Sequence, residues 1–189
     1  MLIKRVFLCL LILISATCLF GSAFANNDAK FLIYPYIKHV DETTAIIIWE
    51  MNKASDGTVY YGSNKGDYDE SVYSKTSTIH YVTIDRLKPN SVYYYRVKSG
   101  KSSTPLNDTS YSFKTALKDT GTFEFAVFGD TDSGVRGSDI DHKRVVKSVN
   151  DFSNPEFIIL PGDLVNNSSS KEDWVRFFHV ENELIKRVP

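Results

Sequence analysis

Cysteine is almost absent from this sequence of 189 residues, since only Cys9 and Cys18 occur and both lie within the first 25 positions. The rest of the chain can form no disulfide, so packing or a bound metal must stabilise it. An excess of one charge is also lacking, because 22 basic residues stand against 23 acidic ones. Nucleic-acid-binding domains usually show a basic patch or stripe, so the sequence does not favour that class. Apolar residues make up 42% and charged residues 24%, which is typical of soluble globular proteins and excludes a disordered or collagen-like chain.

The first 25 residues have the three parts of a secretory signal peptide. Lys4 and Arg5 form a basic start, residues 6–19 are almost wholly apolar, and residues 23–25 (Ala-Phe-Ala) offer a cleavage site. The apolar stretch is shorter than the ~20 residues that a spanning helix needs. We therefore expect cleavage rather than a retained anchor. The mature protein would be secreted, periplasmic or on the cell surface, with no stable membrane span.

Residues 31–116 alternate between short strands and turns. The predicted strands, rich in β-branched and aromatic residues, are 31–37, 44–50, 58–61, 78–84, 92–98 and 111–115. Asp56-Gly57 is the expected turn before 58–61, and residues 92–98 alternate, with Tyr93, Tyr95 and Val97 on one face. Short strands at near-regular spacing predict an all-β sandwich domain, which we place at 26–117.

The pattern changes from residue 122 to β-α-β-α, which is typical of an α/β domain. Strands are expected at 122–128 and 157–160, parallel and joined by a helix over 138–152. Ser138 and Asp141 suit a capping box for that helix, and a second helix should begin at Ser170. The predicted apolar stripes are Val145, Val146, Val149 and Phe152 on the first helix, and Trp174, Phe177, Phe178, Leu184 and Ile185 on the second.

Each of these two strands is followed by a Gly-Asp pair, Gly129-Asp130 and Gly162-Asp163. In α/β units, ligands bind beyond the carboxyl ends of the strands, and neighbouring strands lie ~4.8 Å apart. Two carboxylates would then face each other across a gap that suits cations, as in two-metal phosphatases. Gly-Asp is also a common turn pair, and Gly66-Asp67 is an example. The residues alone therefore leave a metal site and ordinary turns both open.

Several segments of the first half resemble a fibronectin type III-like domain. They are Trp49, residues 59–62 (Val-Tyr-Tyr-Gly), residues 87–97 with their Tyr-Tyr-Tyr-Arg-Val strand, and residues 113–116 (Phe-Lys-Thr-Ala). More narrowly, they resemble the N-terminal domain of purple acid phosphatases. This pattern is specific to the fold and not to a function.

Residues 128–134 (Phe-Gly-Asp-Thr-Asp-Ser-Gly) and 160–167 (Leu-Pro-Gly-Asp-Leu-Val-Asn-Asn) are similar to the start of a calcineurin-like metallophosphoesterase domain. In that family the aspartate of the first motif binds one metal and the aspartate of the second bridges both. The resemblance thus implies that Asp130 and Asp163 are ligands of two divalent or trivalent ions (Fe, Mn or Zn). It also implies an exported hydrolase, acid phosphatase-like, acting on a phosphate-ester substrate.

Two positions depart from the family pattern and join the candidate metal ligands. Asp132 stands where many members have His, and Asn166 stands where purple acid phosphatases have the Tyr that gives their colour. A ferric-tyrosinate centre is therefore not expected, and an oxygen-rich set of ligands suits Mn, Mg or Fe. Asp132 remains either a ligand or a turn residue. His142 either reaches the pocket or is a surface or packing histidine.

The later motifs of the family, above all Gly-Asn-His, do not occur after Asp163. We therefore expect the chain to hold the whole sandwich and, in 118–189, only the incomplete N-terminal part of a metallophosphoesterase domain. Such a fragment should bind metal weakly and turn over little. A P-loop is excluded, because Val135-Arg136 follows the glycine spacing in place of Lys-Ser/Thr.

Two other functions fit the same residues. Asp130-Thr131-Asp132 after an apolar strand is also similar to haloacid dehalogenase-like phosphatases, in which the first aspartate is the nucleophile. Alternatively, the tyrosine-rich sandwich would be a non-catalytic binding or adhesion module at the cell surface. Bound metal and phosphatase activity separate these hypotheses.

Overall fold

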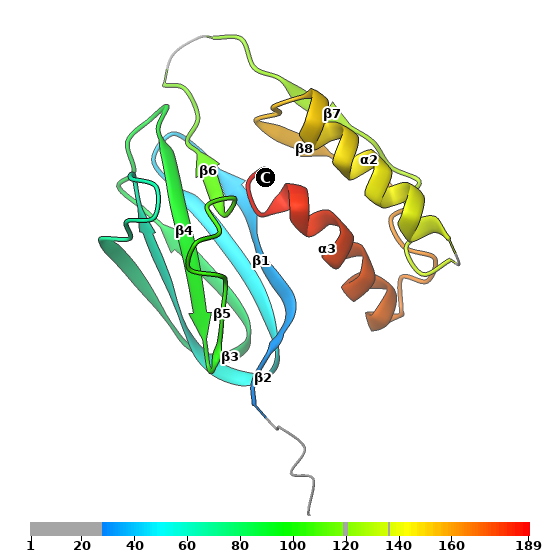
Figure 1. Ribbon diagram of the computed structural model, residues 1–189, viewed down its shortest axis with the longest axis horizontal. Coiled ribbons are helices and arrows are strands. Elements are labelled where there is room, and N and C mark those ends of the chain that lie inside the picture. Colours follow the sequence, from blue (N-terminus) through cyan, green and yellow to red (C-terminus); the bar gives the residue numbers. More distant parts are fainter. Residues whose placement is uncertain (1–27, 119–120, 136) are drawn as a thin grey trace, which may run out of the picture.

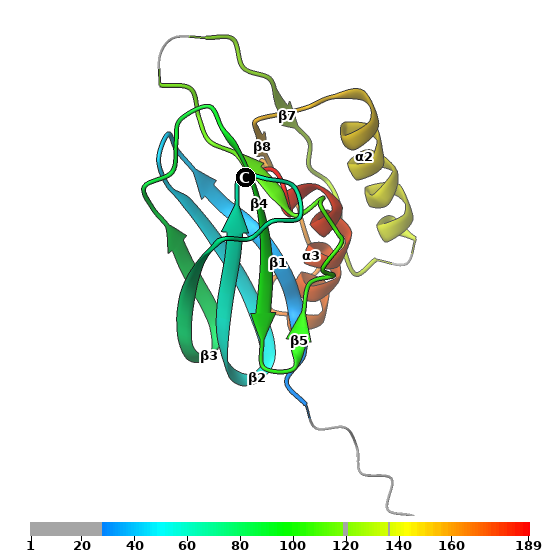
Figure 2. The same cartoon turned by 60° about the vertical axis from the view of Figure 1, so that its left-hand side comes forward.

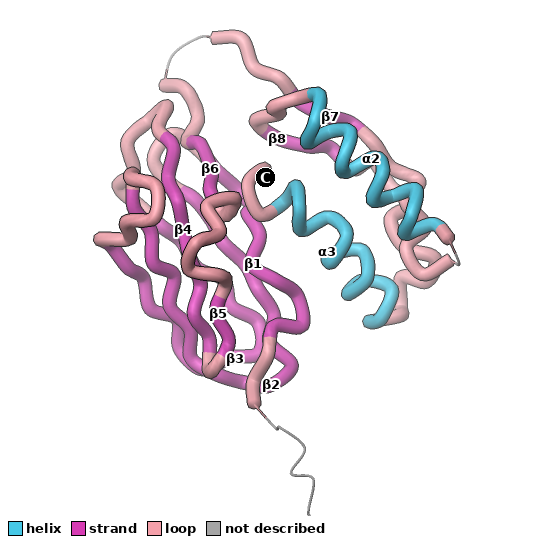
Figure 3. The backbone as a smooth tube through the Cα atoms, viewed as in Figure 1, coloured by secondary structure: helices cyan, strands magenta, loops and turns pink. Residues whose placement is uncertain are grey.

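The computed structural model describes residues 28–118, 121–135 and 137–189; the predicted signal peptide lies outside these residues. Strands gather in one region, which we call the sandwich (28–118), and two helices with a small sheet form a second, the βα region (121–189) (Figures 1 and 3). Helix α3 lies between the sandwich and the rest of the βα region (Figure 1).

The sandwich is built from six strands that pair antiparallel. They are β1 (Phe31–Val40), β2 (Ala45–Gly62), β3 (Glu70–Ile84), β4 (Val92–Ser99), β5 (Ser102–Ser103) and β6 (Ser112–Lys114). β3 follows one edge of β2 along most of its length, whereas the other edge is shared: β1 pairs with residues 45–51 and β4 with residues 57–62. The β2–β3 ribbon therefore belongs to two layers and curves between them (Figure 2).

This continuous β2 corrects the predicted turn at Asp56-Gly57, which lies inside the strand. The change of layer occurs at register shifts between Glu50 and Gly57, while pairing with β3 resumes on both sides. A Cβ atom at Gly57 would lie 2.5 Å from Cζ2 of Trp49. Glycine is therefore needed here for the close approach of the indole ring and not for a turn.

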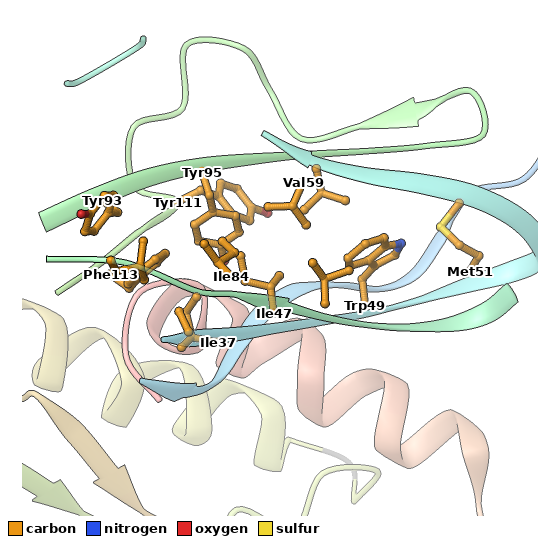
Figure 4. Close-up of a cluster of buried hydrophobic side chains, with 14 residues drawn as sticks. Ile37, Ile47, Trp49, Met51, Val59, Ile84, Tyr93, Tyr95, Tyr111 and Phe113 are labelled. Carbon is orange, nitrogen blue, oxygen red and sulfur yellow. The ribbon is translucent and has the colours of Figure 1, made fainter. Parts of the chain in front are cut away.

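The core of the sandwich lies between its layers (Figure 4). Its largest fully buried side chains are Trp49, Tyr95 and Phe113. The predicted alternation of β4 is confirmed, because Tyr93, Tyr95 and Val97 are buried while the residues between them are not. Burial of such aromatic side chains removes 150–250 Å² of surface each from water, roughly, and dominates the stability of a small sandwich.

The βα region follows the predicted order, with β7 (Phe125–Val127), α2 (Ser138–Phe152), β8 (Phe157–Ile159) and α3 (Lys171–Ile185). β7 and β8 pair parallel, as predicted. The apolar stripe of α2 was predicted only in part: Val146 is buried and Val149 is half-buried, but Phe152 is 87% exposed. His142 takes the inward position one turn before Val146 and is buried.

The two helices begin differently. Ser170 caps α3 by accepting a hydrogen bond from the Asp173 amide. The capping box predicted at Ser138 is wrong, because Gly137 is the N-cap of α2, in a left-handed conformation with φ 93°. Ser138 Oγ instead donates to the carbonyl oxygen of Asp132 at 2.8 Å. No helix among the described residues combines the length and apolarity that crossing a bilayer requires.

Helix α3 packs on the sandwich through aromatic and polar contacts. The Tyr95 hydroxyl donates to the Lys186 carbonyl oxygen at 2.9 Å, and Asn182 Nδ2 donates to the Pro35 carbonyl oxygen at 3.1 Å. The rings of Tyr36 and Phe178 lie 5.1 Å apart. A core tyrosine of the sandwich thus depends on the end of α3 for its hydrogen bond, which couples the two regions.

Candidate metal centre

The candidate site lies on two loops at the carboxyl ends of β7 and β8. We define the first loop as residues 129–134 and the second loop as residues 161–167. They approach closely at their glycines, since a Cβ atom at Gly129 would lie 2.9 Å from the Gly162 carbonyl oxygen. Gly129 therefore allows the two backbones to meet, whereas a Cβ atom at Gly162 would have nothing within 4 Å.

Backbone hydrogen bonds join the two loops side by side. The amides of Thr131 and Ser133 donate to the carbonyl oxygens of Asp163 and Leu164 at 3.0 and 3.2 Å. In return, the Asn166 amide donates to the Ser133 carbonyl oxygen at 3.0 Å, and Ser133 pairs with Val165 as a parallel bridge. The pairing of β7 and β8 therefore continues into the loops, and it places the segments that carry the four predicted ligands next to each other.

Three of the four predicted ligands have a left-handed backbone. Their φ angles are 51° at Asp130, 43° at Asp132 and 53° at Asp163. Residues other than glycine rarely adopt this conformation, although Asp tolerates it better than most. Such conformations persist only where surrounding structure holds them, and they cluster at functional sites. Here the hydrogen bonds between the loops supply that support.

All four predicted ligands can be reached from solvent. Asp130, Asp163 and Asn166 are exposed, and Asp132 is half-buried. Carboxylate and amide oxygens are donors that hard cations such as Mn²⁺ and Mg²⁺ prefer. Within residues 28–118, 121–135 and 137–189, however, no three His, Cys, Asp or Glu side chains come together in a group that could hold a metal ion. The donor chemistry suits a metal, but the described residues do not complete a metal site.

The two histidines of the βα region lie apart from the exposed ligands. His142 is a packing residue, with its ring 5.5 Å from the ring of Phe177, and its Nδ1 atom lies 3.3 Å from Ser133 Oγ of the first loop. His179 is exposed, and its Nε2 atom lies 3.1 Å from the Leu32 carbonyl oxygen of the sandwich. Neither ring contacts a predicted ligand in any interaction seen among the described residues.

Sequence reasoning missed two acidic residues of α3 that hold this site. Asp173 accepts from the Asn167 amide at 3.1 Å, and a Cβ atom at Gly134 would lie 2.4 Å from Asp173 Cγ. Glu181 has no exposed side-chain surface and contacts His142. The signal for Glu181 was present, because it stands four residues after Phe177 on the inward side of the helix, where a charged residue is rarely found unpaired.

Residues 33–115 match the family model of the purple acid phosphatase N-terminal domain. A curated relative, probable purple acid phosphatase 20 of Arabidopsis thaliana, is 29% identical over 175 residues, which are 87% of this chain and 38% of the relative. The chain is similar to purple acid phosphatases. It spans 38% of the length of that relative, so the match includes the sandwich and the βα region but not the whole enzyme.

The solved structure of PhoD shows that the overall fold is shared beyond this family match. It superposes with a TM-score of 0.52 at 14% identity, covering 82% of this chain and 36% of PhoD. A fibronectin type III domain of the human collagen alpha-1(XX) chain matches at a TM-score of 0.36 and 15% identity, over 55% of this chain and 99% of that domain. The strands β1 to β6 themselves make residues 28–118 of this chain β-rich and sandwich-like.

Proposed function

We propose that this chain is part of an exported, metal-dependent phosphoesterase of the purple acid phosphatase type, acting on phosphate esters. In this proposal residues 118–189 begin a metallophosphoesterase domain. Asp130 and Asp163 are ligands of a dinuclear centre, and Asp132 and Asn166 are candidates for further ligands. The candidate metals are Fe, Mn and Zn.

One observation carries the proposal: the backbone pairing of the two Gly-Asp loops. The five amide hydrogen bonds between them run from Asp130 to Asn166, and they continue the parallel β7–β8 pair. Ordinary turns at separate strand ends have no reason to pair in this way. Paired loops at the carboxyl ends of parallel strands, bearing exposed oxygen donors, form the usual position for a ligand in an α/β unit.

The described residues are not expected to catalyse turnover by themselves. They contain no complete group of metal ligands, so the chain should bind Mn²⁺ weakly, with a dissociation constant on the order of millimolar. Equilibrium dialysis with Mn²⁺ tests this directly. We expect the double variant Asp130→Asn/Asp163→Asn to lose that binding and Asp67→Asn, in the third Gly-Asp pair, to retain it. Equal binding by all three proteins would contradict the proposal.

The haloacid dehalogenase-like alternative predicts a different pattern. There, the carboxylate at position 130 attacks phosphorus and displaces para-nitrophenolate, and water then hydrolyses the aspartyl phosphate. Mg²⁺-dependent hydrolysis of para-nitrophenyl phosphate would therefore be lost in Asp130→Asn and kept in Asp163→Asn. The metallophosphoesterase proposal expects no measurable hydrolysis by this chain. Hydrolysis that requires only Asp130 would therefore replace the proposal with the nucleophile mechanism.

A further inference from the structure

The first loop is tied to both helices by a buried chain of three polar side chains: Ser133, His142 and Glu181. Ser133 Oγ lies 3.3 Å from His142 Nδ1, and His142 Nε2 lies 2.6 Å from Glu181 Oε1. In the tautomer with the hydrogen on Nε2, the ring donates to Glu181 Oε1 and Nδ1 accepts from the Ser133 hydroxyl. The chain thus runs from the first loop through α2 to α3.

The order serine, histidine, glutamate resembles a nucleophilic triad, but burial excludes that role. Ser133 has no exposed surface, and the side chains of His142 and Glu181 have none either. A nucleophile must reach its substrate, and this hydroxyl cannot. These three side chains therefore serve the structure of the protein and do not act on a substrate.

Stability alone does not explain why these groups are polar. Glu181 Oε2 is buried and has no hydrogen-bond partner among the described residues, and a buried carboxylate that is only partly satisfied is costly. Replacing such a pair with apolar residues of similar volume is often neutral or stabilising. The polar groups therefore do something that apolar packing would not do equally well.

The residue that His142 and Glu181 hold is Ser133, which lies at the centre of the pairing between the two loops. Ser133 donates its amide to Leu164 and accepts from the Asn166 amide, so its backbone is bonded to the second loop in both directions. The Ser133 side chain is also the first of the three buried, linked side chains. Fixing Ser133 against α2 and α3 therefore fixes the register of both loops, together with the left-handed Asp132 just before it.

We infer that His142 and Glu181 are positioning residues, which lock the first loop through Ser133 and thereby keep the two Gly-Asp loops paired. Their meaning for catalysis rests on the proposed function, in which these loops bear the metal ligands. The positioning of the first loop by these residues does not rest on the proposed function, because the protein without metal already has it.

Hydrogen exchange of the chain, without metal, tests the inference at the amides of Thr131, Ser133 and Asn166. We expect exchange about fivefold faster in Ser133→Ala, which removes one weak hydrogen bond. In the apolar double variant His142→Leu/Glu181→Met, we expect at least about tenfold faster exchange. The conservative variant Glu181→Gln keeps a hydrogen-bond acceptor for His142 Nε2, so its loop amides should exchange at the wild-type rate. If only the charge of Glu181 mattered, the loop amides of this variant would exchange faster than those of the wild type.

Ser99→Ala is the matched control, because it removes hydrogen bonds of a buried side chain within the sandwich, to Ser55 Oγ and the Asp56 carbonyl oxygen, and in the described structure none to α2 or α3. Loop amides that exchange at the wild-type rate in both Ser133→Ala and the double variant would overturn the inference. So would equal acceleration throughout the sandwich, which would indicate global destabilisation. Since exchange is measured without metal, a failed metal-binding experiment would refute the proposed function and leave this result standing.

Discussion

The sandwich and the βα region differ in how well each covers its apolar residues. The sandwich encloses 14 buried residues in one core, whereas the core of the βα region consists of Val146, Val180, Leu184 and Val188. The exposed large apolar residues of the βα region are Phe123, Phe125, Val127, Val135, Ile140, Val145, Phe152 and Ile159. The sandwich can therefore stabilise itself, while the βα region is held largely through α3, which packs on the sandwich.

Removing a core aromatic should separate the two regions most clearly. Trp49→Ala should lower the free energy of unfolding by about 3–5 kcal/mol, because the ring is fully buried and leaves a cavity. Phe152→Ala, in the βα region, should change it by less than about 0.5 kcal/mol, since that ring is 87% exposed. Urea unfolding of both variants measures the difference. Similar losses of unfolding free energy in the two variants would contradict the difference in side-chain burial between the two regions.

Tyr95→Phe should weaken the link between the regions. Its hydroxyl donates to the Lys186 carbonyl oxygen, and removal leaves that buried acceptor unpaired, at a cost of about 1–2 kcal/mol. Hydrogen exchange should show the loss mainly in α3 and α2, with the sandwich strands nearly unchanged. An effect centred on β4 instead would mean that the hydroxyl serves the sandwich core.

Loss of the α3 cap should have a smaller effect. Ser170→Ala removes the acceptor for the Asp173 amide and should cost about 1 kcal/mol in the βα region. Ser169→Ala is the control, because Ser169 is exposed and its side chain caps nothing in the described structure. Thermal unfolding followed by circular dichroism compares the two; equal shifts would argue against the cap.

The smallest expected effect is on the pH dependence of the stability of the sandwich. His80 is buried and stacks on Trp49, with ring centroids 4.4 Å apart, and burial lowers its pKa below the ordinary 6.5. The unfolded chain then takes up a proton first as the pH falls, so the sandwich should lose stability below about pH 6.5 and not above it. His80→Phe should flatten this dependence. An unchanged pH profile in that variant would assign the loss to other groups.

The contrast also explains which features the sequence could predict. The alternation in β4 was predicted because one face of that strand is buried. The β-α-β-α order was predicted from short apolar runs for the strands and from apolar stripes for the helices. The first half of β3, residues 70–77, was missed because this edge segment is mostly exposed on both faces and has no apolar alternation. The continuity of β2 was missed because its change of layer depends on Trp49 lying over Gly57.

The position of the candidate site was predictable from the sequence, but the α3 side chains that support its loops were not. Two Gly-Asp pairs after apolar strands placed both loops at one edge, because parallel strands end together. The inward position of Glu181 on its helix was a signal, but its partner could not be assigned; Asp173 carried no such signal, since acidic residues on a helix usually lie in solvent. Their contacts with His142 and the Asn167 amide require knowing how α3 packs on α2 and the second loop.

The central claim is that the paired Gly-Asp loops bind a metal ion, and paramagnetic broadening by Mn²⁺ tests it most directly. In amide NMR spectra of the chain, low Mn²⁺ should broaden signals of residues 130–133 and 163–166 first, with the Gly66-Asp67 turn unaffected. The double variant Asp130→Asn/Asp163→Asn should abolish that selectivity. Broadening that is equal at Asp67, or that persists unchanged in the double variant, would contradict the account.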